Sequence, residues 1–190
     1  MGQVKVLDTK LADVKIVTPK VFGDQRGFFT ESWSDQDLKA AGILIDFVQD
    51  NHSHSGVNVL RGMHYQKGNA SQTKLVRVTR GAVYDVILDM RKGSPSFGQW
   101  QGFILSESNH RQLLVPKGFA HGFVTLTDDV DFLYKVDTYY TPGADAGIAY
   151  DDPDLGIDWP IDIEHAVLSE KDTQHPQFKD AYNDFVYGEI

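Results

Sequence analysis

The sequence predicts an all-β fold, an antiparallel jelly-roll barrel with a few short peripheral helices. After residue 57, short runs rich in β-branched and aromatic residues follow one another, as expected for strands that pack on a core. The runs span residues 75–78, 82–88, 102–105, 112–115, 122–126 and 132–136. Turn signals with Pro, Gly or Asp separate many of them, at the spacing of roughly 8–12 residues that is typical of β-sandwiches and barrels.

One short helix is predicted before the barrel. Ser34 is a suitable N-cap, Asp35 and Asp37 suit the positive end of the helix dipole, and Gly42 can end the helix in a left-handed conformation. We therefore expect a helical excursion that precedes the first strands of the barrel.

Length and composition favour a single domain over residues 1–190, with a polar and aromatic tail over about 173–190. Apolar residues make up 41% of the chain, but no apolar run approaches the roughly 20 residues of a membrane helix. The chain has no cysteine and no N-terminal secretion signal, so we expect a cytoplasmic protein that does not bind membranes. The formal charge of -9 argues against broad nucleic-acid binding, although a few arginines can still bind an anion.

Alternation along two of the runs points polar side chains into the barrel. Tyr134 has the same parity as Phe132 and Val136, so its hydroxyl is predicted to lie inside. Lys74 shares parity with Val76 in the same way. An ammonium group in apolar space is costly without an anion, so we expect a ligand or a carboxylate near Lys74.

The stretch LRGMHYQ at 60–66 contains a cation and a histidine close together. Strict alternation would place Arg61 and His64 on opposite faces of a strand, and only a bulge near Gly62 would bring both to one pocket. The sequence leaves this question open.

The histidines differ in what they can do. His52 and His54 have a spacing that suits a metal on one face of a strand, but their polar neighbours favour an exposed loop without a metal. His121 lies in VPKGFAHGF at 115–123, which resembles the second motif of the cupin family. Metal-binding cupins carry His-x-His and a glutamate in their first motif, where this chain has His64-Tyr-Gln66. Two histidines are too few for a stable metal site, so we expect a cupin barrel without metal.

For His64, the alternatives to catalysis are a core histidine and a metal ligand. The inward-facing Lys74 and Tyr134 favour catalysis, because a base, an acid and an oxyanion-stabilising cation would then share one cavity. Asp172 in LSEKD at 168–172 is a candidate to orient the imidazole. With neither a cysteine nor a dinucleotide-binding glycine motif in the sequence, the chemistry that remains is proton abstraction next to a carbonyl.

Several segments, taken in sequence order, together resemble the dTDP-4-dehydrorhamnose 3,5-epimerase family. They are FGDQRGFFTE at 22–31, LRGMHYQ at 60–66, VPKGFAHGF at 115–123 and LSEKD at 168–172, with shorter matches at 48–51, 72–76, 80–85, 89–95, 134–135 and 152–160. The resemblance runs from about residue 22 to residue 172 and so covers most of the chain.

The resemblance implies a homodimer without metal or other cofactor. Its substrate would be a dTDP-linked 4-keto-6-deoxyhexose, dTDP-4-dehydro-6-deoxy-D-glucose of L-rhamnose biosynthesis. In this family pattern His64 is the base, Asp172 orients it, Lys74 steadies the enolate, and Tyr134 is the acid that returns a proton to the opposite face.

The resemblance also assigns nucleotide-binding residues. They are Arg26, Phe28, Glu31, Gln49, Asn51 and Arg61, with Tyr140 stacking on thymine and His121 in the binding wall. Forked guanidinium groups suit a diphosphate, and a tyrosine face suits a base. An N-terminal segment of about residues 1–35 is expected to cross to the partner subunit, so part of this set would serve the neighbouring pocket.

Three other functions remain compatible with the sequence. One is a relative that inverts only C3 of a similar nucleotide sugar, although the presence of Tyr134 favours double inversion. The second is a metal-dependent cupin oxygenase or isomerase that uses His64, His121 and a third ligand. The third is a sugar-binding jelly roll without catalytic activity.

Overall fold

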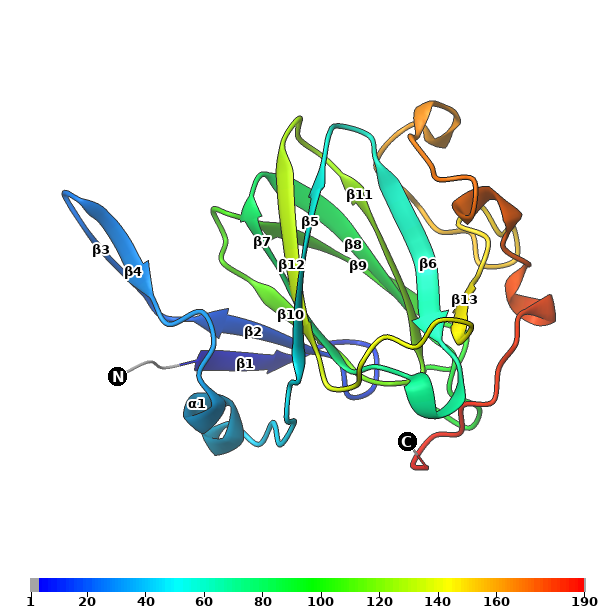
Figure 1. Ribbon diagram of the computed structural model, residues 1–190, viewed down its shortest axis with the longest axis horizontal. Coiled ribbons are helices and arrows are strands. Elements are labelled where there is room, and N and C mark those ends of the chain that lie inside the picture. Colours follow the sequence, from blue (N-terminus) through cyan, green and yellow to red (C-terminus); the bar gives the residue numbers. More distant parts are fainter. Residues whose placement is uncertain (1–3, 190) are drawn as a thin grey trace.

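The computed structural model describes residues 4–189 and contains two antiparallel sheets that face each other (Figure 1). The first sheet has the order β1-β2-β10-β7-β12-β5 and the second β13-β6-β11-β8-β9. Strands of the first sheet are β1 Val4–Asp8, β2 Lys15–Pro19, β10 Gln112–Val115, β7 Lys74–Arg80, β12 Val130–Val136 and β5 Gln49–Ser55. Strands of the second sheet are β13 Asp145–Gly147, β6 Leu60–Gln66, β11 Phe119–Thr125, β8 Ala82–Asp89 and β9 Trp100–Ser106. This architecture confirms the predicted antiparallel β fold.

A hairpin and a few short helices complete the described chain. The hairpin is formed by β3 Val21–Asp24 and β4 Gly27–Thr30. The helices are α1 Asp35–Ala40 and the 3-10 turns η1 Gly68–Ala70, η2 Ile163–His165, η3 Asp172–Gln174 and η4 Phe178–Asp180. None of the helices between residues 4 and 189 is both long and apolar enough to span a bilayer.

The predicted helix forms with the predicted ends. Ser34 Oγ accepts a hydrogen bond from the N–H of Asp37 at 3.3 Å, which satisfies one of the free donors of the first turn. Gly42 follows the helix with φ +83°, a left-handed conformation that favours glycine. Leu38 and Ile43 then pack on the outer face of the six-stranded sheet.

The six predicted runs fall on strands β7 to β12, but β11 has different bounds from the run predicted at 122–126. The strand predicted at 122–126 begins at Phe119, directly after the turn that contains Gly118 with φ +80°. His121, which directly precedes the predicted run, is therefore inside β11. The fully buried pattern of β11 explains the difference, because a strand buried on both faces shows no alternation that marks its beginning.

The prediction of a loop at residues 51–54 is wrong. These residues belong to strand β5, which pairs with β12 along its whole length, from Gln49 opposite Val136 to Ser55 opposite Val130. Its side chains alternate between half-buried and exposed positions. Backbone hydrogen bonding to β12 thus outweighs the low β-propensity of Asn, Asp and Ser.

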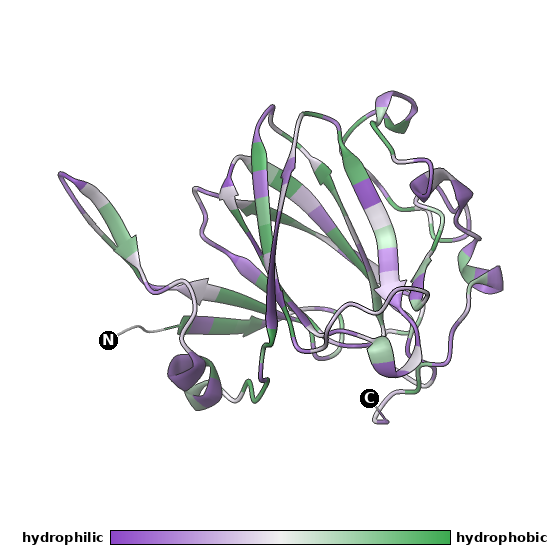
Figure 2. Ribbon diagram, in the orientation of Figure 1, coloured by the Kyte–Doolittle hydropathy of each residue, from purple (hydrophilic) through white to green (hydrophobic). Residues whose placement is uncertain are grey.

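Three apolar clusters hold the layers together. The cluster between the sheets includes Phe132 and Phe123, whose rings stack at 4.3 Å. A second cluster covers the outer face of the five-stranded sheet, where the C-terminal segment contributes Trp159 and Phe185. Burial of each such side chain contributes about 1.5–3 kcal/mol. Figure 2 shows the apolar residues along the strands of both sheets.

The two ends of the described chain behave differently. The C-terminal tail lies along the body of the molecule (Figure 1), and the Tyr65 hydroxyl donates a hydrogen bond to the carbonyl of Tyr182 at 2.5 Å. The β3–β4 hairpin instead projects away from both sheets, and Phe28 and Phe29 on it are 64% and 65% exposed. Residues 1–3 of the predicted exchange segment and residue 190 of the tail lie outside the described residues.

Candidate active site

A cavity of about 510 Å³ opens between the two sheets, beneath the loop at residues 167–172. Six of the predicted site residues line it: Arg61, His64, Lys74, His121, Tyr134 and Asp172. Strands of both sheets contribute, since β6 and β11 form one wall and β7 and β12 form the other. The six predicted residues therefore come from four strands and from Asp172 after the loop, and they meet in one space.

A bulge in β6 brings Arg61 and His64 to the same cavity. His64 pairs with His121 and Arg61 with Phe123, so β6 uses one more residue than β11 over this span. Gly62 adopts φ +135° there, and a Cβ on it would lie 2.4 Å from the Cα of Gly122. Only glycine fits this close approach of two strands. The bulge answers the question that alternation left open.

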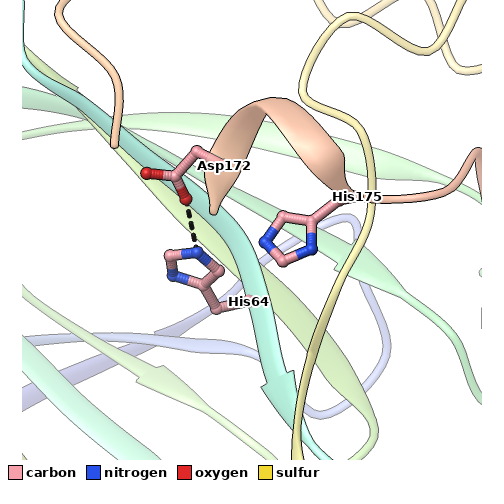
Figure 3. A group of neighbouring side chains, drawn as sticks. All are labelled: His64, Asp172 and His175. Atoms are coloured by element: carbon pink, nitrogen blue, oxygen red, sulfur yellow. Dashed lines mark hydrogen bonds and ion pairs between the residues drawn. The ribbon is translucent and has the colours of Figure 1, made fainter. Parts of the chain in front are cut away.

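His64 is held by a buried carboxylate. Its Nε2 lies 2.5 Å from Asp172 Oδ1 (Figure 3), and Asp172 is only 3% exposed. Ser169 Oγ donates to the other oxygen, Asp172 Oδ2, at 2.7 Å. Burial alone would raise the pKa of Asp172, but the hydrogen bonds from His64 and Ser169 outweigh it and hold the pKa below its usual range. The carboxylate is therefore ionised and can accept a hydrogen bond from the imidazole.

A second histidine lies beside this pair and was missed by the sequence interpretation. His175 directly follows η3, and its ring meets that of His64 edge to face at a centroid distance of 5.3 Å. Burial and the charge of His64 lower the pKa of His175. The spacing of three residues from Asp172 was the only sequence signal. His175 does not belong to the lining of the cavity.

Lys74 and Tyr134 reach the cavity from the opposite sheet, as their parity predicted. Lys74 on β7 pairs with Val136, two residues from Tyr134 on β12, so the two side chains are diagonal neighbours on one face. Among residues 4–189, no hydrogen-bond or ion-pair partner of Lys74 Nζ is found. Burial lowers the pKa of Lys74 to about 8, with Asp85 and Asp145 opposing the shift. Burial raises the pKa of the Tyr134 hydroxyl, which therefore stays protonated at neutral pH.

A second histidine–carboxylate pair occupies the wall next to His64. His121 Nε2 lies 2.8 Å from Asp85 Oδ2, and Asp85 is fully buried on β8. The sequence interpretation missed Asp85, although its shared parity with the core residues Val83 and Ile87 was a usable signal. The Asp85 contact fixes the orientation of the His121 ring.

The other six predicted binding residues do not line the cavity of their own chain. Arg26, Phe28 and Glu31 are on or next to the projecting hairpin, where Arg26 pairs with Asp24 at 2.5 Å. The remaining three lie on β5 and in the loop after β12: Gln49, Asn51 and Tyr140. Gln49 Nε2 donates to Asn51 Oδ1 at 2.8 Å, and Tyr140 is 52% exposed. Gln49 and Asn51 share a face of β5 with Ser53, which does line the cavity.

The chain is similar to known proteins over most of its length. The family model described as dTDP-4-dehydrorhamnose 3,5-epimerase matches residues 8–180. The chain is 51% identical over 172 residues to the dTDP-4-dehydrorhamnose 3,5-epimerase of Salmonella typhimurium, covering 90% of this chain and 93% of the relative.

Two solved structures are similar over almost their whole length. The dTDP-4-dehydrorhamnose 3,5-epimerase of Bacillus anthracis, with TDP and PPi bound, has a TM-score of 0.88 and 50% identity, covering 92% of this chain and 99% of that one. The dTDP-6-deoxy-D-glucose-3,5-epimerase of Legionella pneumophila, in complex with dTDP-4-keto-L-rhamnose, has a TM-score of 0.89 and 47% identity, covering 93% and 94%.

Proposed function

This chain belongs to the dTDP-4-dehydrorhamnose 3,5-epimerase family, and we propose that it converts dTDP-4-dehydro-6-deoxy-D-glucose to dTDP-4-dehydro-L-rhamnose by inverting C3 and C5. It is thus an isomerase of L-rhamnose biosynthesis. Both inverted carbons are next to the 4-keto group, so removal of either proton yields an enolate whose charge lies on the same oxygen. One base and one oxyanion site can therefore serve both centres.

The observation that carries the mechanism is the placement of base and acid on opposite walls. His64 and its carboxylate partner lie on the β6 side, whereas Lys74 and Tyr134 come from the facing sheet. Inversion requires that a proton leave one face of the sugar and that another arrive on the opposite face. A base and an acid across a cavity meet this requirement.

Each group has a defined task in this mechanism. His64 Nε2 is hydrogen-bonded to Asp172, so Nδ1 of the same ring accepts the proton from the substrate. The Asp172 carboxylate then stabilises the imidazolium that forms. Lys74 without a protein partner is free to stabilise the enolate oxygen. Tyr134, kept protonated by its raised pKa, donates the new proton, at least at C5.

Substrate binding is proposed to involve two copies of the chain. Arg61 lies in the cavity and suits the diphosphate of the nucleotide. The projecting hairpin carries Arg26 and Phe28 away from the cavity of its own chain, and its exposed phenylalanines need a partner surface. A homodimer in which each hairpin completes the pocket of the other chain explains both facts. Tyr140, Gln49 and Asn51 would then bind thymine at the rim.

Proton NMR of the product formed in deuterium oxide tests this function. Double inversion predicts deuterium at both C3 and C5 of the product. Label at C3 alone would instead identify a C3-only epimerase, and binding without any exchange would identify a sugar-binding protein without activity. Loss of turnover to a chelator, with recovery on addition of iron or zinc, would identify a metal-dependent cupin.

The proposed setting is the cytoplasm, and the proposed binding partners are the nucleotide sugar and a second copy of the chain. The formal charge of -9 disfavours nucleic acid as a partner. Activity measured in the cytosolic and membrane fractions of a cell lysate would test this placement, since recovery in the membrane fraction would contradict it.

A further inference from the structure

We propose that His64, Asp172 and His175 form a binding site for a divalent transition-metal ion such as Zn²⁺, and that Zn²⁺ bound there inhibits the enzyme. Each of the three residues offers one ligand atom, and these atoms all lie within 4.8 Å of one another. Figure 3 shows His64 joined to Asp172 by a hydrogen bond, and a nitrogen of the neighbouring His175 ring on the side that faces His64. Two imidazoles and one carboxylate, with one coordination position left open, are a donor set that zinc accepts.

Only small movements are needed to close the ligands around an ion. Bonds of about 2.0–2.2 Å to a tetrahedral zinc ion place the donor atoms about 3.4 Å apart. The 2.5 Å contact between His64 Nε2 and Asp172 Oδ1 must open slightly, and the His175 ring must move inward. Because Asp172 begins η3 and His175 directly follows it, one short turn carries two of the three ligands.

His175 has a buried ring nitrogen that is available to coordinate a metal ion. Its Nε2 is buried, and no hydrogen-bond partner is found for it within residues 4–189. A buried nitrogen without a partner is costly, and coordination to a metal would recover that cost. Gly147 creates the space for the ring, since a Cβ on Gly147 would lie 2.4 Å from this nitrogen.

The proposed ion would compete with the catalytic proton relay. Zinc coordinated to His64 Nε2 and Asp172 displaces the hydrogen bond between them. The neutral imidazole then carries its proton on Nδ1, so no lone pair is left for the substrate. This inhibitory effect rests on the proposed function, but metal binding by the three residues does not. His121 is not a member of the group, because its Nε2 contacts Asp85.

Calorimetric titration of Zn²⁺ into the full-length, substrate-free protein tests the site directly. We expect His175→Gln to weaken zinc binding by at least about tenfold, because even the loss of an outer-shell partner typically costs 10–100-fold. His175→Phe, which keeps an aromatic ring against His64, should do the same. His165→Gln is the matched control, since His165 is an exposed histidine paired with Asp162 at 2.8 Å, and it should leave binding unchanged.

Two results of the titration would overturn the site. One is a wild-type protein that binds no Zn²⁺. The other is unchanged affinity in both His175 variants, with the loss found instead in His54→Gln, since His54 and His52 share the carboxylate of Asp131 on the surface.

Activity measurements test the inhibition separately. We expect Zn²⁺ to inhibit the wild type reversibly, with recovery on addition of EDTA, and His175→Gln to require at least about tenfold more Zn²⁺. Mg²⁺, which prefers oxygen ligands, should not inhibit. Equal zinc sensitivity of the wild type and His175→Gln would overturn the inhibitory role. A protein that binds zinc through His175 but lacks epimerase activity would contradict the proposed function and leave the site intact.

Discussion

At the scale of single residues, the proposed chemistry depends on the His64 imidazole, whose Nε2 contacts Asp172 Oδ1. We predict that His64→Ala abolishes solvent exchange at both C3 and C5, a loss of at least about 10²–10⁴ in rate. Binding of dTDP should remain largely intact, because the nucleotide contacts are assigned to other side chains. Deuterium incorporation followed by NMR, with calorimetry for dTDP, measures both effects. Near-normal turnover of the variant would show that another group is the base.

Tyr134 is the group whose removal should separate the two inversions. We predict that Tyr134→Phe slows product formation at C5 by about 10²-fold or more, while exchange of the C3 proton continues. The physical reason is that the phenyl ring keeps the packing against Phe132 but has no proton to deliver. Time courses of deuterium incorporation at each carbon provide the measurement. An equal loss at both carbons would contradict a specific role at C5.

Deprotonation of Lys74 should lower the activity of the enzyme at alkaline pH. In the proposed mechanism the ammonium form stabilises the enolate, and burial lowers the pKa of Lys74 to about 8. The active charged form is therefore present below this pH and is lost as the pH rises through it. We predict that kcat/KM, which reports on the free enzyme, falls above a pH of about 8.

The control for this pH dependence is Lys74→Arg. A guanidinium remains charged to higher pH, so the alkaline fall should move upward even though the maximal rate decreases. If the fall stayed at the same pH in Lys74→Arg, another group would be responsible for it.

At the scale of secondary-structure elements, the bulge in β6 is the feature that assembles the site. It turns Arg61 and His64 toward one cavity, and Gly62 makes it possible because of its φ of +135° and its contact with β11. We predict that Gly62→Ala destabilises the fold by more than the roughly 1–3 kcal/mol of a strained backbone alone. Activity should fall with it, because His64 would no longer face the substrate. Urea unfolding and turnover provide the two readouts.

Gly93→Ala is the matched control for the bulge. Gly93 also has a positive φ, of +82°, but a Cβ there would meet nothing within 4 Å. This variant should therefore lose stability only through the strain of a positive φ in a non-glycine residue, and it should retain activity. Equal destabilisation by Gly62→Ala and Gly93→Ala would show that the close approach to Gly122 is unimportant.

At the scale of the whole molecule, the projecting hairpin is proposed to complete the pocket of the partner chain, and mixed dimers can test this. We predict that Arg26→Ala and His64→Ala are each strongly impaired, but that mixed dimers of the two recover part of the activity. One pocket in each mixed dimer would combine an intact hairpin from one chain with an intact His64 from the other. Co-expression with two different tags isolates the mixed species. No recovery in a verified mixed dimer would place Arg26 in the pocket of its own chain.

Local sequence patterns were sufficient for much of the fold and for two inward-facing residues of the candidate site. The runs of β-branched residues predicted the central strands, Ser34 and Gly42 predicted the helix ends, and parity predicted that Lys74 and Tyr134 point inward. These features depend on neighbours within a few residues, so period and propensity reveal them. Parity would also have revealed Asp85, whose burial follows from the same alternation.

What the sequence by itself determined is an antiparallel β fold with inward-facing polar groups that resemble those of an epimerase. Only the tertiary structure decided that polar residues 49–55 form a strand, that Gly62 bends β6, and that His175 lies against His64. It also placed half of the predicted site residues, all of them binding residues, outside the cavity of their own chain. These four features share one physical reason. Each depends on contacts between segments that are far apart in the sequence, and no local pattern encodes such contacts.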